Sequence, residues 1–257
     1  MAINHLSLEG KIAIITGASS GLGKQFALSM AEAGATVVLT ARRMDRLQAL
    51  AAEIEGNGGQ AMPLALDVTD SANIEAVLDA VESKYGCADV LVNNAGIGNT
   101  QSFLDMSEAS WDAMMDTNLK SVWRFSQAFS KRLIKAEKPG NVVNIASILG
   151  LGSAAQLCHY ATAKAGVVQL TKVLALELAR HQIRVNAIAP GYFCTEMNED
   201  VLTTEKGKAY IVKKVPMRRL GLTQELVGPM LLLASDAGSF MTGAVIAVDG
   251  GHVVNSL

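Results

Sequence analysis

The chain has 257 residues, half of them hydrophobic and 18% charged. This balance fits a globular protein with a large core and excludes a disordered one. Twenty-two basic and 24 acidic residues give a net charge of -2, so no basic excess is available for binding nucleic acid. The three widely spaced cysteines, Cys87, Cys158 and Cys194, exclude a disulfide framework or a zinc site and favour a reducing compartment. No secretion signal is visible, and polar residues interrupt the uncharged stretch 139–163, so we expect a cytoplasmic protein without a membrane span.

Short β-branched runs alternate along the chain with longer helical patterns. They predict strands over 11–16, 36–40, 60–66, 90–93, 141–146, 184–188 and 244–248. The patterns between them predict helices over 22–33, 44–55, 71–84, 107–135, 154–180 and 224–235, with Asp70 or Ser71 as the cap of the third. Several strands are apolar on both faces, as in a parallel sheet that helices cover on both sides. The predicted fold is therefore α/β: a doubly wound, Rossmann-type parallel sheet in three α/β/α layers.

No linker rich in Pro, Gly or Ser divides the chain, and no repeat is evident, so we expect residues 1–257 to form one domain. The segment 192–219 has poor periodicity and several charges. In this type of fold it is expected to be a loop or helical flap over the ligand crevice. The alternative is a surface insertion without a role.

A glycine-rich turn directly follows the first predicted strand and opens the first helix. Its residues are Gly17, Ser19, Ser20, Gly21, Leu22 and Gly23, within the run Thr16–Gly23. Glycines at this place permit a tight turn and let the backbone approach a pyrophosphate at the helix N-terminus. An ordinary turn is the alternative, since the spacing is G-x-x-x-G-x-G, and the absence of a Gly-Lys-Ser/Thr ending disfavours a phosphate-hydrolysing P-loop.

The residues at the end of the second strand indicate whether the site prefers NADP or NAD. An acidic residue here would bind the ribose 2′-hydroxyl and repel a 2′-phosphate, but the run is Thr40-Ala41-Arg42-Arg43. Arg42 and Arg43 can pair with a phosphate through charge-assisted hydrogen bonds, although two solvated arginines at a helix cap are the alternative. The pattern favours NADP(H) over NAD(H).

Three residues form a candidate catalytic set. Tyr160 and Lys164 are four apart in a helical pattern, so both side chains lie on one face. The nearby ammonium is expected to lower the pKa of Tyr160. Ser147 follows the fifth strand, where open α/β sheets bind ligands, and can donate a hydrogen bond to a substrate oxygen. The alternative for Tyr160 and Lys164 is a pair on a helix surface.

The sequence resembles the short-chain dehydrogenases/reductases, in their compact single-domain branch, over essentially the whole chain. The motifs that carry the resemblance are Thr16–Gly23, Asp67-Val68, Asn93–Gly96, Asn118, Ser147, Tyr160-x-x-x-Lys164, Pro190-Gly191 and the closing run 243–251. Within this branch of about 250 residues, the sequence is similar to members of the 3-oxoacyl-[acyl-carrier-protein] reductase type.

The resemblance implies a role for each catalytic candidate. Tyr160 is the general acid in ketone reduction and the base in alcohol oxidation, and Lys164 also holds the nicotinamide ribose. Asn118 supports a water-linked proton relay. From the residues alone, Asn118 can equally be a helix-interior asparagine with a backbone bond.

The resemblance also assigns cofactor contacts. Asp67 and Val68 contact the adenine, while Asn94, Ala95 and Gly96 back the central ribose, with a cap or tight turn as the alternative for these three. The resemblance places the nicotinamide carboxamide against the loop of Pro190, Gly191, Phe193 and Thr195. In this loop the Phe193 backbone and Thr195 act as donors. One departure weakens the NADP assignment: many NADP-using members carry a basic residue where this chain has Ser20, so phosphate recognition rests mainly on Arg42.

We therefore predict an NADP(H)-dependent oxidoreductase that moves a hydride between the nicotinamide and a small-molecule carbonyl or secondary alcohol. Ketone reduction, of a 3-oxoacyl thioester or of a cyclic or aliphatic ketone, is the favoured direction. Two alternatives are a cofactor-binding sensor or scaffold without significant turnover, and a methyltransferase on a similar sheet, which does not need the Tyr160–Lys164 pair. The resemblance implies a homodimer or homotetramer built through the two long helices.

Overall fold

The computed structural model describes residues 5–196 and 198–255. Its sheet has seven parallel strands in the order β3-β2-β1-β4-β5-β6-β7. The strands are β1 (Ile12–Thr16), β2 (Thr36–Ala41), β3 (Gln60–Ala65), β4 (Val90–Asn93), β5 (Gly140–Ile145), β6 (Ile183–Pro190) and β7 (Val245–Val248). The predicted doubly wound parallel sheet is confirmed, and the strand order reverses between β1 and β4.

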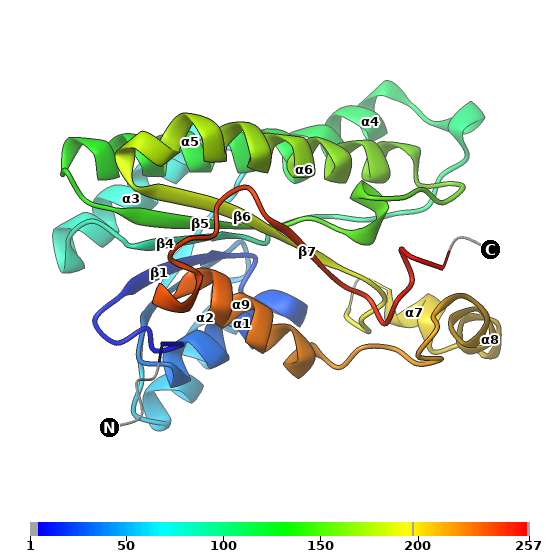
Figure 1. Ribbon diagram of the computed structural model, residues 1–257, viewed down its shortest axis with the longest axis horizontal. Helices are drawn as coiled ribbons and strands as arrows, with labels where there is room; N and C mark the ends of the chain where they lie inside the picture. The colour runs from blue at the N-terminus through cyan, green and yellow to red at the C-terminus, as the bar shows by residue number, and fades with distance from the viewer. Residues whose placement is uncertain (1–4, 197, 256–257) are drawn as a thin grey trace.

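Helices cover both faces of the sheet (Figure 1). On one face lie α1 (Gly21–Glu32), α2 (Met44–Gly56) and α9 (Val227–Ala234), and on the other lie α3 (Ser71–Tyr85), α5 (Ser121–Lys135) and α6 (Cys158–Leu178). Each side has its own apolar core, because the strands alternate their buried side chains between the two layers: Ile15 packs in the first core and Ile14 in the second. The Asp70 side chain caps α3 by accepting bonds from the amides of Ala72 and Asn73.

The two long helical patterns differ from the expected continuous helices. The first is divided into α4 (Glu108–Met115), the π-helical turn η2 (Asp116–Lys120) and α5. The second begins at Cys158 rather than 154, since Gln156 has a left-handed φ of 64° that no α-helix accommodates. Both departures lie where the chain passes the carboxyl end of the sheet.

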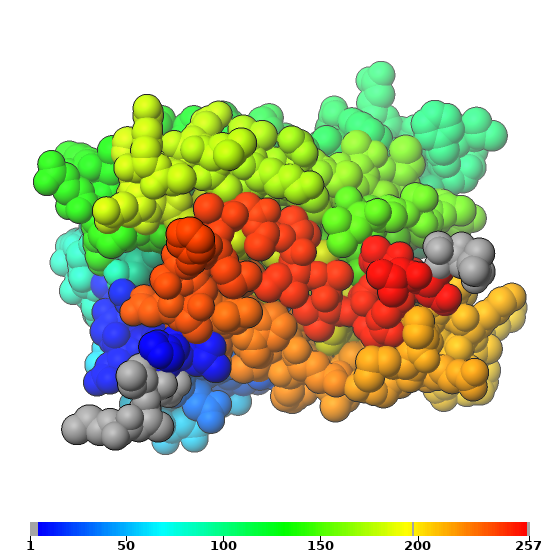
Figure 2. All heavy atoms as spheres, viewed as in Figure 1, coloured from blue at the N-terminus to red at the C-terminus, as the bar shows by residue number. Residues whose placement is uncertain are grey.

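The segment 192–219 contains two short helices, α7 (Glu199–Leu202) and α8 (Glu205–Lys214). We call this segment the flap. It has a small apolar core of Leu202, Ile211 and Val215, separate from the cores beside the sheet. Figure 2 shows that β7 and the residues after it lie across the surface between the flap and α6. Within the described ranges, no helix is long and apolar enough to cross a membrane.

Candidate active site

A cleft of about 970 Å³ lies at the carboxyl ends of the strands, beside the point where the strand order reverses. Open α/β sheets bind their ligands at this place. The predicted site residues that line it are Gly17, Ser19, Ser20, Gly21, Leu22, Arg42, Asp67, Val68, Asn94, Ala95, Gly96, Ser147, Tyr160, Lys164, Pro190, Gly191, Phe193 and Thr195. Gly23 and Asn118, also predicted, lie behind the lining. Segments from six loops, far apart in the sequence, thus meet at one cleft.

The glycine-rich turn is packed too tightly for side chains. Gly17 has a φ of +68°, and a Cβ on it would lie 2.9 Å from the Ala95 Cα. A Cβ on Gly23 would lie 2.3 Å from the Gly17 carbonyl oxygen. The side-chain amide of Asn94 holds the turn, because its Nδ2 donates to the Thr16 carbonyl at 2.8 Å. Gly23 therefore shapes the turn from behind.

The N-terminus of α1 opens into the cleft at this turn. Ser20 is the N-cap residue but makes no side-chain capping bond, and the first turn of α1 holds no acidic residue. Amides at a helix N-terminus with no side-chain cap are suited to an anion. The turn and helix therefore fit a pyrophosphate.

Arg42 and Arg43 both line the cleft, but their surroundings differ. Arg43 donates to the hydroxyls of Ser19 at 3.0 Å and Ser20 at 2.9 Å, and it pairs with Glu196 at 3.2 Å. Arg42 is exposed, and its charge helps to lower the pKa of Asp67, after the larger effect of two hydrogen bonds from Thr69 to that carboxylate. The sequence favoured Arg42 for the phosphate, but Arg43 is the arginine that lies against the glycine-rich turn. Glu196 was not predicted, and no motif marks it.

Ser147, Tyr160 and Lys164 meet at the carboxyl end of β5. Ser147 is almost buried, follows the end of β5, and accepts a hydrogen bond from the Leu149 amide at 3.1 Å. The Lys164 Nζ donates to the Ile145 carbonyl at 2.7 Å and lies 5.8 Å from the centre of the Tyr160 ring. Burial lowers the pKa of Lys164 to about 8. This value lies above neutral pH, so the charged form of Lys164 predominates there.

The expected lowering of the Tyr160 pKa is wrong for this structure. Burial raises the pKa of Tyr160, and a hydrogen bond with the Ser147 side chain offsets only part of that increase. Loss of hydration destabilises the charged phenolate by more than the hydrogen bond with Ser147 stabilises it. Tyr160 is therefore a neutral phenol at neutral pH, the form that can donate a proton.

Asn118 is fully buried in the π-helical turn η2. Its Oδ1 accepts from the Ile97 amide and its Nδ2 donates to the Ile97 carbonyl, both at 2.8 Å. This is the backbone bond that the sequence left open as an alternative. π-helical turns occur often at functional sites, and this one fixes Ile97, which lines the cleft. A part in a proton relay stays a prediction.

The start of the flap lines the same cleft through Phe193, Thr195 and Asn198. Thr195 packs on the glycine-rich turn, where a Cβ on Gly21 would lie 3.4 Å from its side chain. Asn198 accepts from the Thr195 amide and donates to the Phe193 carbonyl, both at 2.9 Å. Sequence reasoning missed Asn198, because a single asparagine in an aperiodic segment carries no signal. Its Oδ1 accepts from the Thr195 amide and, at 3.4 Å, also from the Thr195 hydroxyl, so Asn198 holds both donors of Thr195.

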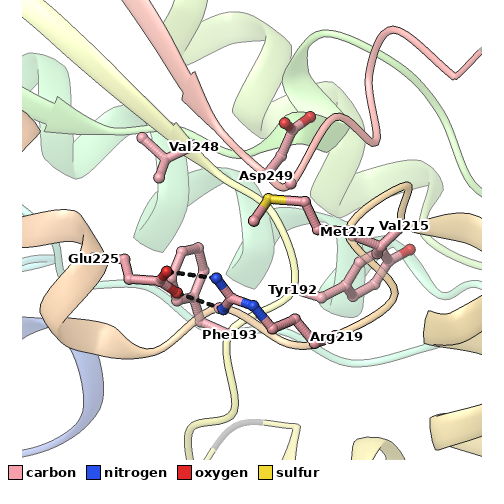
Figure 3. Close-up of a pocket in the computed structure, with 10 residues that line it drawn as sticks. Tyr192, Phe193, Val215, Met217, Arg219, Glu225, Val248 and Asp249 are labelled. Carbon is pink, nitrogen blue, oxygen red and sulfur yellow. Dashed lines mark hydrogen bonds and ion pairs between the residues drawn. The ribbon is translucent and has the colours of Figure 1, made fainter.

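A smaller cavity of about 110 Å³ lies behind this loop (Figure 3). Its walls include Phe193 from the loop after β6 and Asp249 from the end of β7. Arg219 and Glu225 pair across it through two hydrogen bonds of 2.8 and 2.7 Å. This pair ties the end of the flap to the chain before α9.

The chain is similar to known proteins over nearly its whole length. A family model described as Enoyl-(Acyl carrier protein) reductase matches residues 17–253. A 3-oxoacyl-[acyl-carrier-protein] reductase of Thermotoga maritima is 42% identical over 97% of this chain and 100% of its own. A short-chain type dehydrogenase/reductase from Mycobacterium marinum has a solved structure that matches with a TM-score of 0.93 at 42% identity, over 97% of this chain and 98% of its own. A gluconate 5-dehydrogenase from Burkholderia cenocepacia, solved with NADP and tartrate, matches with a TM-score of 0.95 at 33% identity, over all of both chains.

These matches span nearly the whole chain and define a class of α/β oxidoreductases. The chain belongs to the short-chain dehydrogenase/reductase family. The predicted resemblance is confirmed.

Proposed function

We propose that the protein is an NADP(H)-dependent oxidoreductase that interconverts a small-molecule carbonyl and its secondary alcohol, with ketone reduction as the main direction. One observation carries the proposal: a single cleft holds the glycine-rich turn and its arginines at one end and Ser147, Tyr160 and Lys164 at the other. A binding module would need only the first end. It would not need Tyr160 as a proton donor beside Ser147.

The residues of the cleft fit the dinucleotide. The N-terminus of α1 would hold the pyrophosphate, and Arg42 and Arg43 would hold the 2′-phosphate. Asp67 and Val68 would contact the adenine, and Lys164 the nicotinamide ribose. When bound, the nicotinamide supplies or accepts the hydride. The NADP found in the gluconate 5-dehydrogenase of the same fold supports the choice of cofactor.

The chain's own residues supply the proton. In reduction, the Tyr160 hydroxyl gives its proton to the carbonyl oxygen as the hydride arrives at the carbonyl carbon, so that the alcohol forms neutral. The Ser147 hydroxyl hydrogen-bonds the same oxygen and holds it beside Tyr160. The Lys164 ammonium, 5.8 Å from the ring centre, stabilises the phenolate that Tyr160 becomes. Oxidation reverses each step, with Tyr160 as the base.

The first experiment follows NADPH consumption by the purified protein with a panel of carbonyl compounds, in parallel with NADH. The panel contains 3-oxoacyl thioesters and keto sugar acids, which the relatives' names suggest, together with diketones, cyclic ketones and steroids. Tyr160→Phe is expected to abolish reduction and to leave NADPH binding intact, because the ring stays and only the proton donor is lost. Equal turnover by Tyr160→Phe would refute the mechanism. Binding of NADPH without turnover of any carbonyl would favour the sensor or scaffold.

We also propose that the chain is one domain that assembles as a homodimer or homotetramer in the cytoplasm. Exposed apolar side chains on the two long helices, Trp123 on α5 and Val173 and Leu176 on α6, support assembly through these helices. The exposed fraction of Leu176 is 82%. Light scattering during size-exclusion chromatography tests this, and a monomer of 27.0 kDa would contradict it.

A further inference from the structure

His159 is a fully buried histidine that the proposed mechanism does not use. It lies in the first turn of α6, directly before Tyr160. Its Nδ1 accepts a hydrogen bond from the Tyr160 amide at 3.0 Å, and its Nε2 lies 3.0 Å from the Asn99 Oδ1. A backbone amide can only donate, so Nδ1 carries no proton and Nε2 donates to Asn99. Burial also lowers the pKa of His159, which favours this neutral form.

Asn99 belongs to the segment 94–102 after β4, which forms no helix or strand of its own. Ile97 and Gly98 of this segment line the cleft that also holds Ser147 and Tyr160. Asn94 and Ala95, at the start of the segment, bind Thr16 beside the glycine-rich turn. Contacts with neighbouring elements hold residues 97–101 at three further points. Asn118 binds both backbone groups of Ile97, His159 binds Asn99, and the Gln101 amide donates to the Gln156 carbonyl at 2.8 Å.

The middle contact differs from the other two because it joins the segment to the residue beside Tyr160. An imidazole ring is rigid, so its two nitrogens keep a constant spacing between the Tyr160 amide and the Asn99 side chain. A movement of the segment at Asn99 would therefore be transmitted to the start of α6. The ring connects the wall of the cleft with the helix that carries the proton donor.

We propose that His159 is a positioning residue that, through Asn99, holds residues 97–102 as the substrate-facing wall of the cleft. It touches neither substrate nor cofactor and acts through Asn99 and the Tyr160 backbone. The inference rests on the proposed function. It says that His159 helps to fix the shape of the substrate end of the same cleft. The cofactor end, formed by the glycine-rich turn and the arginines, does not depend on it.

The test compares His159→Phe, Asn99→Ala and the double variant, with the best carbonyl of the panel. Asn99→Ala is expected to raise KM about tenfold with little change in kcat, as the loss of one hydrogen bond at the wall predicts. His159→Phe is expected to raise KM similarly and also to lower kcat, because the Tyr160 amide loses its acceptor. The double variant should be no worse in KM than His159→Phe alone. His159→Gln, whose amide can reach Asn99, should recover most of the KM.

Two further measurements separate positioning from a general loss of structure. Hydrogen exchange of amides 97–102 should quicken in His159→Phe and Asn99→Ala, while the Kd for NADPH stays within about twofold of the parent. His181→Phe, a half-buried histidine beyond the other end of α6, is the matched control and should change none of these values.

The outcomes separate a failure of the positioning role of His159 from a failure of the proposed oxidoreductase function. Unchanged KM and unchanged exchange in Asn99→Ala, or multiplying effects in the double variant, would overturn the role of His159 while Tyr160→Phe still confirmed the reaction. If the parent protein reduces no carbonyl, the proposed function fails. Faster exchange of the segment in both single variants would then still support the contact, and unchanged exchange would overturn it.

Discussion

Lys164→Met is expected to remove a pH-dependent component of the stability of the fold. The Lys164 ammonium is buried, and its pKa is about 8 in the folded chain against 10.5 for the free side chain. Below about pH 8 the native state must hold this charge without water, whereas the unfolded state keeps it hydrated. Between these two pKa values the unfolded chain binds more protons, so the native state gains stability as the pH rises.

The size of the effect follows from the two pKa values. Linkage gives a gain of about 2 kcal/mol for the native protein between about pH 7 and pH 9.5. Lys164→Met cannot show this gain, and its lost bond to the Ile145 carbonyl adds an offset that does not vary with pH. The difference in stability between the parent protein and the variant should therefore change by about 2 kcal/mol over that range, in favour of the parent.

Urea unfolding at several pH values measures this difference, with Lys172→Met as the matched control. Lys172 lies on the same helix but is exposed, so its removal should shift the unfolding curve equally at every pH. A pH-independent difference between the parent and Lys164→Met would refute the reasoning, since it would show that the native and unfolded states titrate this lysine alike.

Two further substitutions test the cofactor end of the cleft. Arg43→Ala and Arg42→Ala are each expected to weaken NADPH binding about tenfold and to leave NADH binding nearly unchanged, because a 2′-phosphate contact is charge-assisted. Calorimetric titration with both cofactors measures this, and equal weakening of the two would refute the phosphate role. Gly23→Ala is expected to cost about 1–3 kcal/mol in urea unfolding and to weaken both cofactors, since the new Cβ would lie 2.3 Å from the Gly17 carbonyl oxygen and 2.5 Å from the Asn94 Nδ2. An unchanged unfolding midpoint would show that the turn can relax around a methyl group.

The strands and most helices could be predicted because their signals are local. β4 has the predicted bounds, and Asp70 caps α3 as one of the two residues proposed for it. The π-helical turn around Asn118 could not be predicted, since its residues fit a continuous α-helix equally well. The predicted start of α6 is wrong, because Gln156 takes a left-handed conformation and its carbonyl accepts from the Gln101 amide of a distant loop, which no local pattern indicates.

In the candidate site, too, the residues marked by a local pattern could be predicted, whereas the contacts between distant loops could not. Tyr160 and Lys164 could be predicted because four residues along a helix place two side chains on one face, and the glycine-rich turn because a strand and a helix flank it. The pairing of Glu196 with Arg43 joins residues 153 positions apart, and the contact between His159 and Asn99 joins residues 60 apart. No spacing rule predicts such pairs, because each depends on how two loops meet.

The sequence by itself determined the parallel α/β sheet, the family and the chemical groups at the carboxyl ends of the strands, since periodicity and short motifs are properties of neighbouring residues. Only the tertiary structure decided the electrostatic state of the site. Burial makes Tyr160 a weaker acid and brings the pKa of Lys164 down to about 8. Hydration is lost only when distant segments close around a side chain, so the direction of these shifts could not follow from the spacing of Tyr160 and Lys164 alone.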